Sequence, residues 1–542
     1  MKVAKACKQC RTSKRKCSLM EGRGSCAPCA QRKLQCSLAS QTGRESSRLH
    51  RPILPQKADS TASTSGDLDD ISSEVCDDLV DLYLRLIHDK PHTLFHPRTI
   101  RERIQRGTAP KGIVYCIMAL GGRFSRDSQI VARVPEFSSK ARSLVKANID
   151  DISLESIQAT ILLGNIIGAD GDHDAASLFF GEAFRGVLVA LEYSNFHVGV
   201  AIKTAQILHL PDRSADDDAI EMETKLRTWW TLYMIDNWAS AGLGLPRQFP
   251  TSTPYPAPMW EKHFYDLHPG EVVNDRHLAK PDLWAHMLTL TRIFGQVQDL
   301  HRNHVAGKLT DFDVDAATQN LADELDLYAR ELPLEIQLNR ETLAQHARIG
   351  LGQAFVALHL GYHHYATLLY FHYLNLDLEQ TATVKKFASQ CKHHAVAYSD
   401  LLRASTEQKG CEAVYFIVSH MTVVSSAVLL HTLLFGHESD LPLTRERLAR
   451  NFQVLISLRK YWPAVAVMID RLSTFQNMCM WSVDPNTHRV DNWTVKFLLE
   501  HALPIEDKNI EVTTLVIDNV RLTERRGFAQ RALSTLFSNH TT

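Results

Sequence analysis

Residues 7–36 read Cys7-Lys-Gln-Cys10-Arg-Thr-Ser-Lys-Arg-Lys-Cys17, then a loop over 18–25, then Cys26-Ala-Pro-Cys29-Ala-Gln-Arg-Lys-Leu-Gln-Cys36. Each half has the spacing C-x2-C-x6-C, so one pattern of cysteines is written twice. Two thiolates in a C-x2-C turn can close on a single metal ion, and Zn²⁺ takes four sulfurs in a tetrahedral arrangement. The stretch therefore predicts a small N-terminal module that is held together by metal.

The number of ligands limits how the metal can be bound. Six sulfurs fill the eight coordination places of two zinc ions only if two of the sulfurs are shared, so a binuclear cluster with two bridging thiolates is the simplest solution. One zinc ion with four cysteines and two spare thiols, or three disulfides, would also use these residues. Disulfides require an oxidising compartment, and the first residues of the chain show no apolar secretory segment, which favours zinc. The remaining cysteines contain no C-x2-C pair and are expected to be reduced thiols: Cys76, Cys116, Cys391, Cys411 and Cys479.

The charge of the chain is divided unevenly. Residues 1–36 contain ten Lys and Arg against one acid, Glu21, whereas the remaining residues carry 50 basic and 60 acidic side chains. The near-zero net charge of the whole chain is thus the sum of +9 in residues 1–36, the basic head, and −10 in residues 37–542. Six thiolates and two Zn²⁺ would leave the head at about +7. Such a head is attracted to phosphate backbones, so the composition predicts binding to double-stranded DNA.

The doubled cysteine spacing and its basic residues resemble the fungal binuclear zinc-cluster, or Zn(2)-Cys(6), transcription factors. The resemblance implies two zinc ions per chain, with the sulfurs of Cys7 and Cys26 bridging them. It also implies a short helix after Cys10 that enters the major groove and reads a CGG triplet. The chain differs from the usual pattern at Ser13, which is often basic, and in its inter-half loop, which has glycines where a proline is common. The metal ligands expected from this resemblance are Cys7, Cys10, Cys17, Cys26, Cys29 and Cys36, and the expected DNA contacts are Arg11, Lys14, Arg15 and Lys16. Lys14 is the first choice for a guanine contact, and Lys16 for a phosphate contact.

The rest of the chain is predicted to be a linker followed by a large helical domain. We place the DNA-binding domain at 1–40 and a flexible linker at 41–70, because Ser, Thr, Gly, Gln and Asp dominate the linker. No sustained heptad pattern occurs in 37–70, so any homodimer is expected to form through the helical domain. Strand signals are sparse throughout, and 71–504 is predicted to be all-α. The segment 505–542 either completes that domain or provides an activation surface.

Several blocks of the helical region resemble the fungal-specific transcription factor domain, also called the middle homology region. The most specific block is 223–236, with Arg227, Trp229, Trp230 and Asp236, followed by Leu243-Gly-Leu-Pro246. Further expected helices begin near residue 71, at Gly112, after a Ser153 N-cap, and over 175–191. The 414–435 stretch is long and apolar enough to span a bilayer, but it lies within a helical domain and is predicted to be a core helix.

Three other sequence features were weighed as metal sites. His88, His92 and His96 recur every four residues, but Pro91 and Pro97 argue against a continuous helix that would align them. His359 and His363 lie one turn apart among Tyr and Leu residues, which is more typical of a packed helix than of a metal site. The Asp170–Asp174 segment begins like a calcium loop but lacks its glycine and closing glutamate, so it is predicted to be a turn.

Together these features predict a nuclear, sequence-specific transcription factor of the RNA polymerase II type. It is expected to act on CGG-type sites of metabolic or specialised-metabolite genes, with the transcription machinery or coregulators as partners and no membrane association. The alternative is a zinc-dependent interaction module or corepressor that does not bind DNA. An enzyme is not expected, because G-x-S-x-G, P-loop, G-x-G-x-x-G and H-E-x-x-H motifs are missing. Zinc with four thiolates also has no open position for a catalytic water.

Overall fold

The computed structural model divides the chain into two compact units, Met1–Asp70 and Ile71–Thr542, which are described separately. Of the first unit, the structure describes only Cys29, which is helical and buried. The linker predicted at 41–70 lies outside the described residues, and so does the helix predicted over 175–191. In the second unit the structure describes 71–90, 92–148, 150–171, 199–212, 214, 216–250, 255–272, 281–481, 490–506, 527, 528, 530 and 531. The predicted domain boundaries stay predictions.

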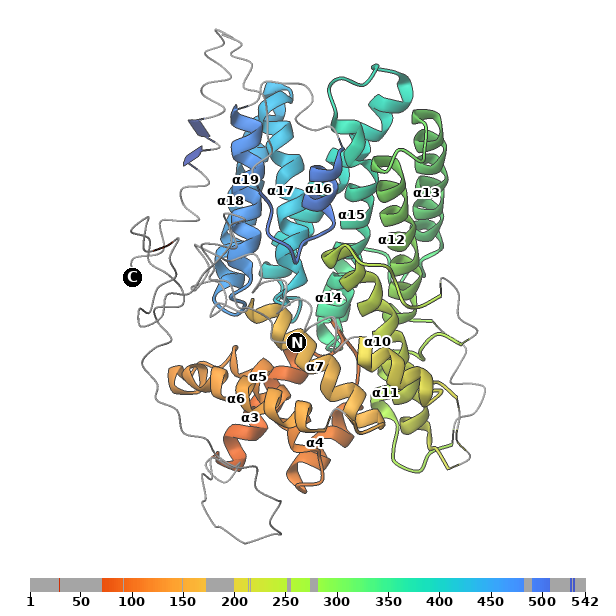
Figure 1. Ribbon diagram of the computed structural model, residues 1–542, viewed down its shortest axis with the longest axis vertical. Coiled ribbons are helices and arrows are strands. Elements are labelled where there is room, and N and C mark those ends of the chain that lie inside the picture. Colours follow the sequence, from red (N-terminus) through yellow and green to blue (C-terminus); the bar gives the residue numbers. More distant parts are fainter. Residues whose placement is uncertain are drawn as a thin grey trace. The chain divides into compact units, whose positions relative to one another are not determined.

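The second unit is built of helices packed on helices, and its described residues contain no strand (Figure 1). The predicted all-α class is therefore confirmed. Its helices before residue 250 are α3 (Ser73–Leu86), α4 (Pro97–Gln105), α5 (Lys111–Gly122), α6 (Ser128–Ala147), α7 (Leu154–Asp170) and α10 (Ala219–Leu243). Those after it are α11 (Glu261–Asp266), α12 (Leu283–Val305), α13 (Asp311–Glu331), α14 (Arg340–Arg348), α15 (Gly352–Tyr370), α16 (Ala382–Glu407), α17 (Ile417–Phe435), α18 (Leu441–Arg459), α19 (Val465–Trp481) and α20 (Asn492–Leu498). Residues 199–207 are also helical, and two short 3-10 helices cover Phe371–Leu374 and Glu438–Asp440.

Local sequence signals explain where several helices begin and end. The predicted Ser153 N-cap is confirmed: its hydroxyl accepts a hydrogen bond from the Ser156 N–H at 3.1 Å. Asp218 and Glu221 form a capping box at the start of α10. This helix ends at Gly244, whose φ of 66° lies in the left-handed region that glycine adopts most readily. Pro97 occupies the first turn of α4, where a missing N–H costs nothing.

The N-terminal helices form a layer in which α5 is central. This helix packs against α3, α6 and α7 (Figure 1), and nearly all its side chains are buried, as expected for the block that begins at Gly112. The helix ends at Gly122, the second residue of a Gly121-Gly122 pair. Gly121 faces α3 so closely that a Cβ atom there would lie 2.2 Å from the Leu79 carbonyl oxygen. The close crossing of the two helices therefore requires a glycine.

Gly121→Ala is expected to destabilise the second unit by about 1–3 kcal/mol, because a main-chain atom of α3 must move to admit the methyl group. Thermal unfolding of the full chain, followed by far-UV circular dichroism, measures this. Gly168→Ala on α7 is the matched control, since a Cβ there meets nothing within 4 Å. That variant should gain up to about 1 kcal/mol from the better helix propensity of alanine. Equal thermal midpoints for the two variants would contradict the claim that the contact between α3 and α5 requires glycine at position 121.

The long C-terminal helices pack in succession: α12 on α13 and α15, α15 on α16, and α17 on α16, α18 and α19. Figure 1 shows them as a bundle of roughly upright helices. Among the described residues α17 alone is long and apolar enough to cross a membrane, and 94% of its apolar window is buried inside the protein. The prediction of a core helix over 414–435 is confirmed.

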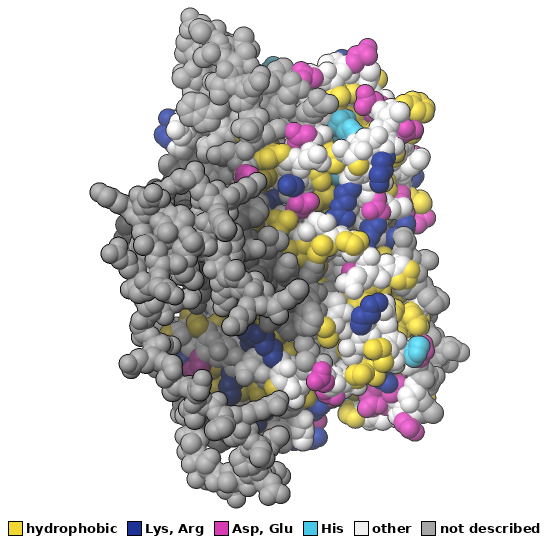
Figure 2. All heavy atoms as spheres, viewed as in Figure 1, with side chains coloured by type: hydrophobic (Ala, Val, Ile, Leu, Met, Phe, Trp, Pro, Cys, Tyr) yellow, Lys and Arg dark blue, Asp and Glu magenta, His cyan; other side chains and the backbone are white. Residues whose placement is uncertain are grey.

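The outer face of these helices carries both charged and hydrophobic side chains. Figure 2 shows Lys, Arg, Asp and Glu side chains interspersed with single hydrophobic ones on the right-hand side of the view. The most exposed large apolar residues of the described part are Phe312, Leu334 and Val272, at 81%, 77% and 72%. Apolar residues scattered in this way are normal on a surface that faces water.

Candidate functional site

The predicted zinc ligands and DNA contacts lie almost wholly outside the described residues. Cys29 is the exception: its backbone is helical, and only 1% of the residue is exposed to solvent. A buried cysteine on a helix suits a thiolate that is enclosed around a metal, so this position fits the predicted ligand set. The other ligands and all four basic contact residues stay predictions: Cys7, Cys10, Cys17, Cys26, Cys36, Arg11, Lys14, Arg15 and Lys16.

A buried polar centre of the second unit surrounds Arg227, a residue of the Trp-Trp block. Its guanidinium is fully buried; Nε donates to Glu223 Oε1 at 2.8 Å, and one terminal nitrogen donates to the Met259 carbonyl at 2.7 Å. The guanidinium also lies 4.5 Å from the centre of the Phe264 ring. Burial acts to lower the pKa of Arg227, but the carboxylates of Glu223 and Glu261 more than compensate and leave this pKa raised. Arg227 is therefore a permanent buried cation that joins α10 to α11.

The other motif residues of that block hold the same region together. Asp236 accepts hydrogen bonds from the main-chain N–H groups of Gln248 and Phe249, at 2.8 and 2.9 Å. Trp230 donates its indole N–H to the Pro256 carbonyl at 2.7 Å. The segment that follows Gly244 is thus folded back along α10, and the motif has a structural role. Its aromatic side chains Trp229, Trp230 and Tyr233 are buried.

The histidines at 88, 92 and 96 shape the turn between α3 and α4. His88 Nε2 accepts from the main-chain N–H groups of Leu94 and Phe95 at 3.2 and 3.1 Å. His92 lies between Tyr83 and Asn165, at 2.9 and 2.8 Å, and burial lowers its pKa to about 3. His96 caps α4. The ring nitrogens named here are engaged within the fold.

The same holds for two histidines of α15, His359 and His363. His359 donates from Nε2 to the Ile336 carbonyl at 2.8 Å, and the Nδ1 atoms of His363 and His394 are 3.0 Å apart. Within the described part of the chain, no three His, Cys, Asp or Glu side chains are grouped so that they could hold one metal ion.

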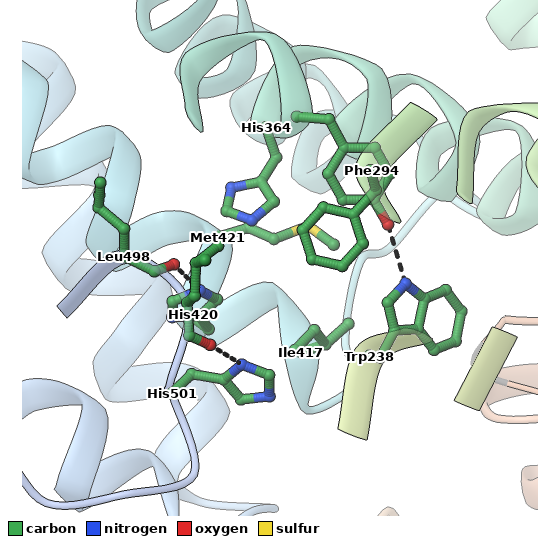
Figure 3. Close-up of a pocket in the computed structure, with 10 residues that line it drawn as sticks. Trp238, Phe294, His364, Ile417, His420, Met421, Leu498 and His501 are labelled. Atoms are coloured by element: carbon green, nitrogen blue, oxygen red, sulfur yellow. Dashed lines mark hydrogen bonds between the residues drawn. The ribbon is translucent and has the colours of Figure 1, made fainter. Parts of the chain in front are cut away.

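A small cavity lies where α10, α12, α15 and α17 meet residues 498–501 (Figure 3). The centre of a water molecule can occupy about 20 Å³ of it, which is room for roughly one water. Its lining is apolar and aromatic apart from three imidazoles, those of His364, His420 and His501. Nothing in the linear sequence brings these three histidines together, since they are separated by 56 and 81 positions. Sequence reasoning missed this cluster for that reason.

Two protein-family models match the chain. The fungal Zn(2)-Cys(6) binuclear cluster domain matches residues 5–45, and the fungal-specific transcription factor domain matches residues 80–308. The chain thus carries both domains that the cysteine spacing and the Trp-Trp block predict, a Zn(2)-Cys(6) cluster domain and a fungal-specific transcription factor domain. The family that these domains define is a class of DNA-binding transcription regulators and not of enzymes, and its zinc-cluster domain binds zinc. The resemblance drawn from the cysteine spacing is confirmed.

Two curated relatives of this chain are distant from it in sequence. An uncharacterized transcriptional regulatory protein of Schizosaccharomyces pombe is 21% identical over 432 residues, which cover 72% of this chain and 50% of the relative. The Zn(2)-C6 fungal-type transcription factor FTF1c of Fusarium oxysporum f. sp. lycopersici is 21% identical over 442 residues, or 74% of this chain and 46% of the relative. The chain thus matches about half the length of these relatives.

Proposed function

We propose that this zinc-cluster transcription factor reads CGG-type sites through a binuclear cluster of two Zn²⁺ held by Cys7, Cys10, Cys17, Cys26, Cys29 and Cys36. The observation that carries the proposal is the coincidence of two features in one short stretch. Residues 5–45 match the zinc-cluster model, and residues 1–36 have a net charge of +9. The basic side chains supply sequence-independent attraction to phosphate, and the metal fixes the short helix that presents them.

In this proposal Lys14 contacts guanine in the major groove, and Lys16 contacts phosphate, with Arg11 and Arg15 beside them. The protein acts in the nucleus on metabolic or specialised-metabolite genes, with coregulators bound by the helical domain of residues 71–504. Selection of bound duplexes from a random pool, with the full-length protein at fixed salt and with or without a zinc chelator, tests the site. Enrichment of one CGG supports a monomer, and two triplets at fixed spacing support a homodimer that forms through the helical domain.

Failure to enrich any sequence would contradict DNA reading. The alternative function, a zinc-dependent interaction module or corepressor without direct DNA binding, would then account for the zinc module better.

Lys14→Ala is expected to weaken binding to a CGG duplex by roughly 10- to 100-fold and to relax the preference at one base pair, because a base contact is worth about 1–3 kcal/mol. Lys16→Ala is the matched control: it should weaken all duplexes nearly equally and reduce the slope of affinity against salt by about one ion. Affinities for a CGG duplex and a scrambled duplex, measured over a range of salt, separate the two effects. A Lys14→Ala protein as tight and selective as the wild type would contradict the assignment.

A further inference from the structure

The segment 490–506 contacts α10, α17 and α19 and is held mainly through its main chain. Arg471 of α19, which is 1% exposed, donates to the carbonyl oxygens of Lys496 and Phe497 at 2.5 and 3.0 Å, and also to that of Leu503. The Ala502 N–H donates to the Gly242 carbonyl of α10 at 3.1 Å. We call residues 490–506 the strap. Its attachment depends on a buried cation that caps the C-terminal end of α20.

Three histidines lie together where the strap contacts α15 and α17. His420 of α17 and His501 of the strap have stacked rings with centroids 4.6 Å apart, and His364 of α15 approaches His420 edge-on at 5.4 Å. Figure 3 shows these rings along one side of the cavity, with Phe294 and Trp238 opposite. His364 and His420 are buried, at 4% and 3% exposure, and His501 is half-buried.

The hydrogen bonds place a proton on one nitrogen in each of two of these rings. His420 Nε2 lies 3.1 Å from the Leu498 carbonyl and must donate to it, because a carbonyl oxygen only accepts. His501 Nδ1 likewise donates to the Leu499 carbonyl at 3.1 Å. Among the described residues, the Nδ1 atoms of His364 and His420 have no hydrogen-bond partner. A proton added to His420 Nδ1 would therefore be buried without an acceptor.

The charges around the cavity oppose protonation. Arg471 is the nearby cation, Glu500 of the strap is the nearby carboxylate, and Arg302 of α12 is close enough to interact with Glu500. The lining from α10 and α12, Trp238 and Phe294, does not titrate, and Tyr365 of α15 accepts a hydrogen bond from Trp238. Burial lowers the pKa of His364 to about 3, with His501 adding to the effect. Burial and the neighbouring His501, His364 and Arg471 lower the pKa of His420 well below its usual value.

We propose that the strap is a proton-sensitive latch: uptake of protons by His364, His420 and His501 releases residues 490–506 from α10, α17 and α19. The direction follows from proton linkage. The docked strap keeps the histidines neutral, whereas the released state exposes them to water, where imidazole titrates near pH 6.5. Docking is therefore at full strength above about pH 6.5 and weakens as the pH falls below it. Each histidine that is uncovered contributes roughly tenfold between about pH 7.5 and 5.5, so the three rings together contribute up to roughly 1,000-fold.

Hydrogen–deuterium exchange of the full-length protein tests the proposal, because the Ala502 amide lies at the strap's contact with α10. After correction for the intrinsic pH dependence of exchange, its protection factor should fall by up to roughly 1,000-fold from about pH 7.5 to 5.5. Amides of α3 and α5 should keep theirs. In a His364→Gln, His420→Gln protein the fall should shrink to roughly tenfold, which is the part that His501 contributes.

His431→Gln is the matched control, since His431 is buried on the same α17 and has the same kind of bond, from Nε2 to the Leu374 carbonyl at 3.1 Å. It should keep the full pH response of the strap. If the double variant does not fold, His501→Gln, at a half-buried position, should reduce the response by roughly tenfold. The proposal is overturned if Ala502 protection is independent of pH, if the histidine variants respond as strongly as the wild type, or if α3 and α5 lose protection together with the strap.

Discussion

Cys29→Ala is expected to abolish specific DNA binding, with a loss of at least about 10³-fold in affinity for a CGG duplex. Structural zinc sites supply roughly 10–16 kcal/mol to the folding of small modules, so removal of one thiolate leaves residues 1–40 without most of their folding energy. What remains is the attraction of a basic, unfolded segment for phosphate, which is typically 10³-fold or more weaker than specific binding. Fluorescence anisotropy with specific and scrambled duplexes at one salt concentration measures the difference.

Zinc content of the same proteins decides how many ions the six cysteines hold. A binuclear cluster predicts two zinc ions per wild-type chain, whereas four ligands with two spare thiols predict one, and disulfides predict none. Cys76→Ala is the control, because Cys76 is a half-buried residue of α3 outside the doubled spacing. It should retain both the zinc and the affinity. A Cys29→Ala protein that keeps two zinc ions and its selectivity would remove Cys29 from the ligand set.

Helices could be predicted from the sequence wherever the signal is local. The cap at Ser153 needs only a hydroxyl three residues before an N–H, and the apolar run of α17 is continuous in the sequence, so both were predicted correctly. The zinc-cluster domain was predictable for the same reason, because all six expected zinc ligands lie within thirty consecutive residues.

Features that depend on distant contacts were not predictable. Glu223 and Arg227 are four residues apart, which on most helices indicates a solvent-exposed pair. Their burial follows from the Met259 carbonyl and the Phe264 ring, more than thirty residues further along. The cluster of His364, His420 and His501 likewise arises only when the strap docks. The cavity and the latch are therefore products of tertiary packing, and no local pattern indicates them.

Arg227→Ala is expected to lower the free energy of unfolding of the second unit by about 3–5 kcal/mol. This loss is larger than the one expected for Gly121→Ala. The substitution leaves the Glu223 carboxylate buried without its cation and leaves the Met259 carbonyl without its guanidinium donor. Arg450→Ala is the matched control, because Arg450 pairs with Glu446 at the same spacing and at 2.7 Å, but both side chains are about half exposed. Its loss should be roughly 0–0.5 kcal/mol. Urea unfolding of the full-length proteins, followed by far-UV circular dichroism, gives both values.

The double variant Glu223→Met, Arg227→Met tests the origin of that loss. If the cost comes from an uncompensated buried charge, removal of both charges should recover much of the stability, since apolar side chains of similar length can replace a buried ion pair. Some loss should remain, because Glu223 Oε1 also accepts from the Met259 N–H at 2.9 Å and this donor would become unpaired. A double variant as unstable as Arg227→Ala would show that the guanidinium acts through its packing on Phe264 and its bond to Met259, and not as a partner of Glu223.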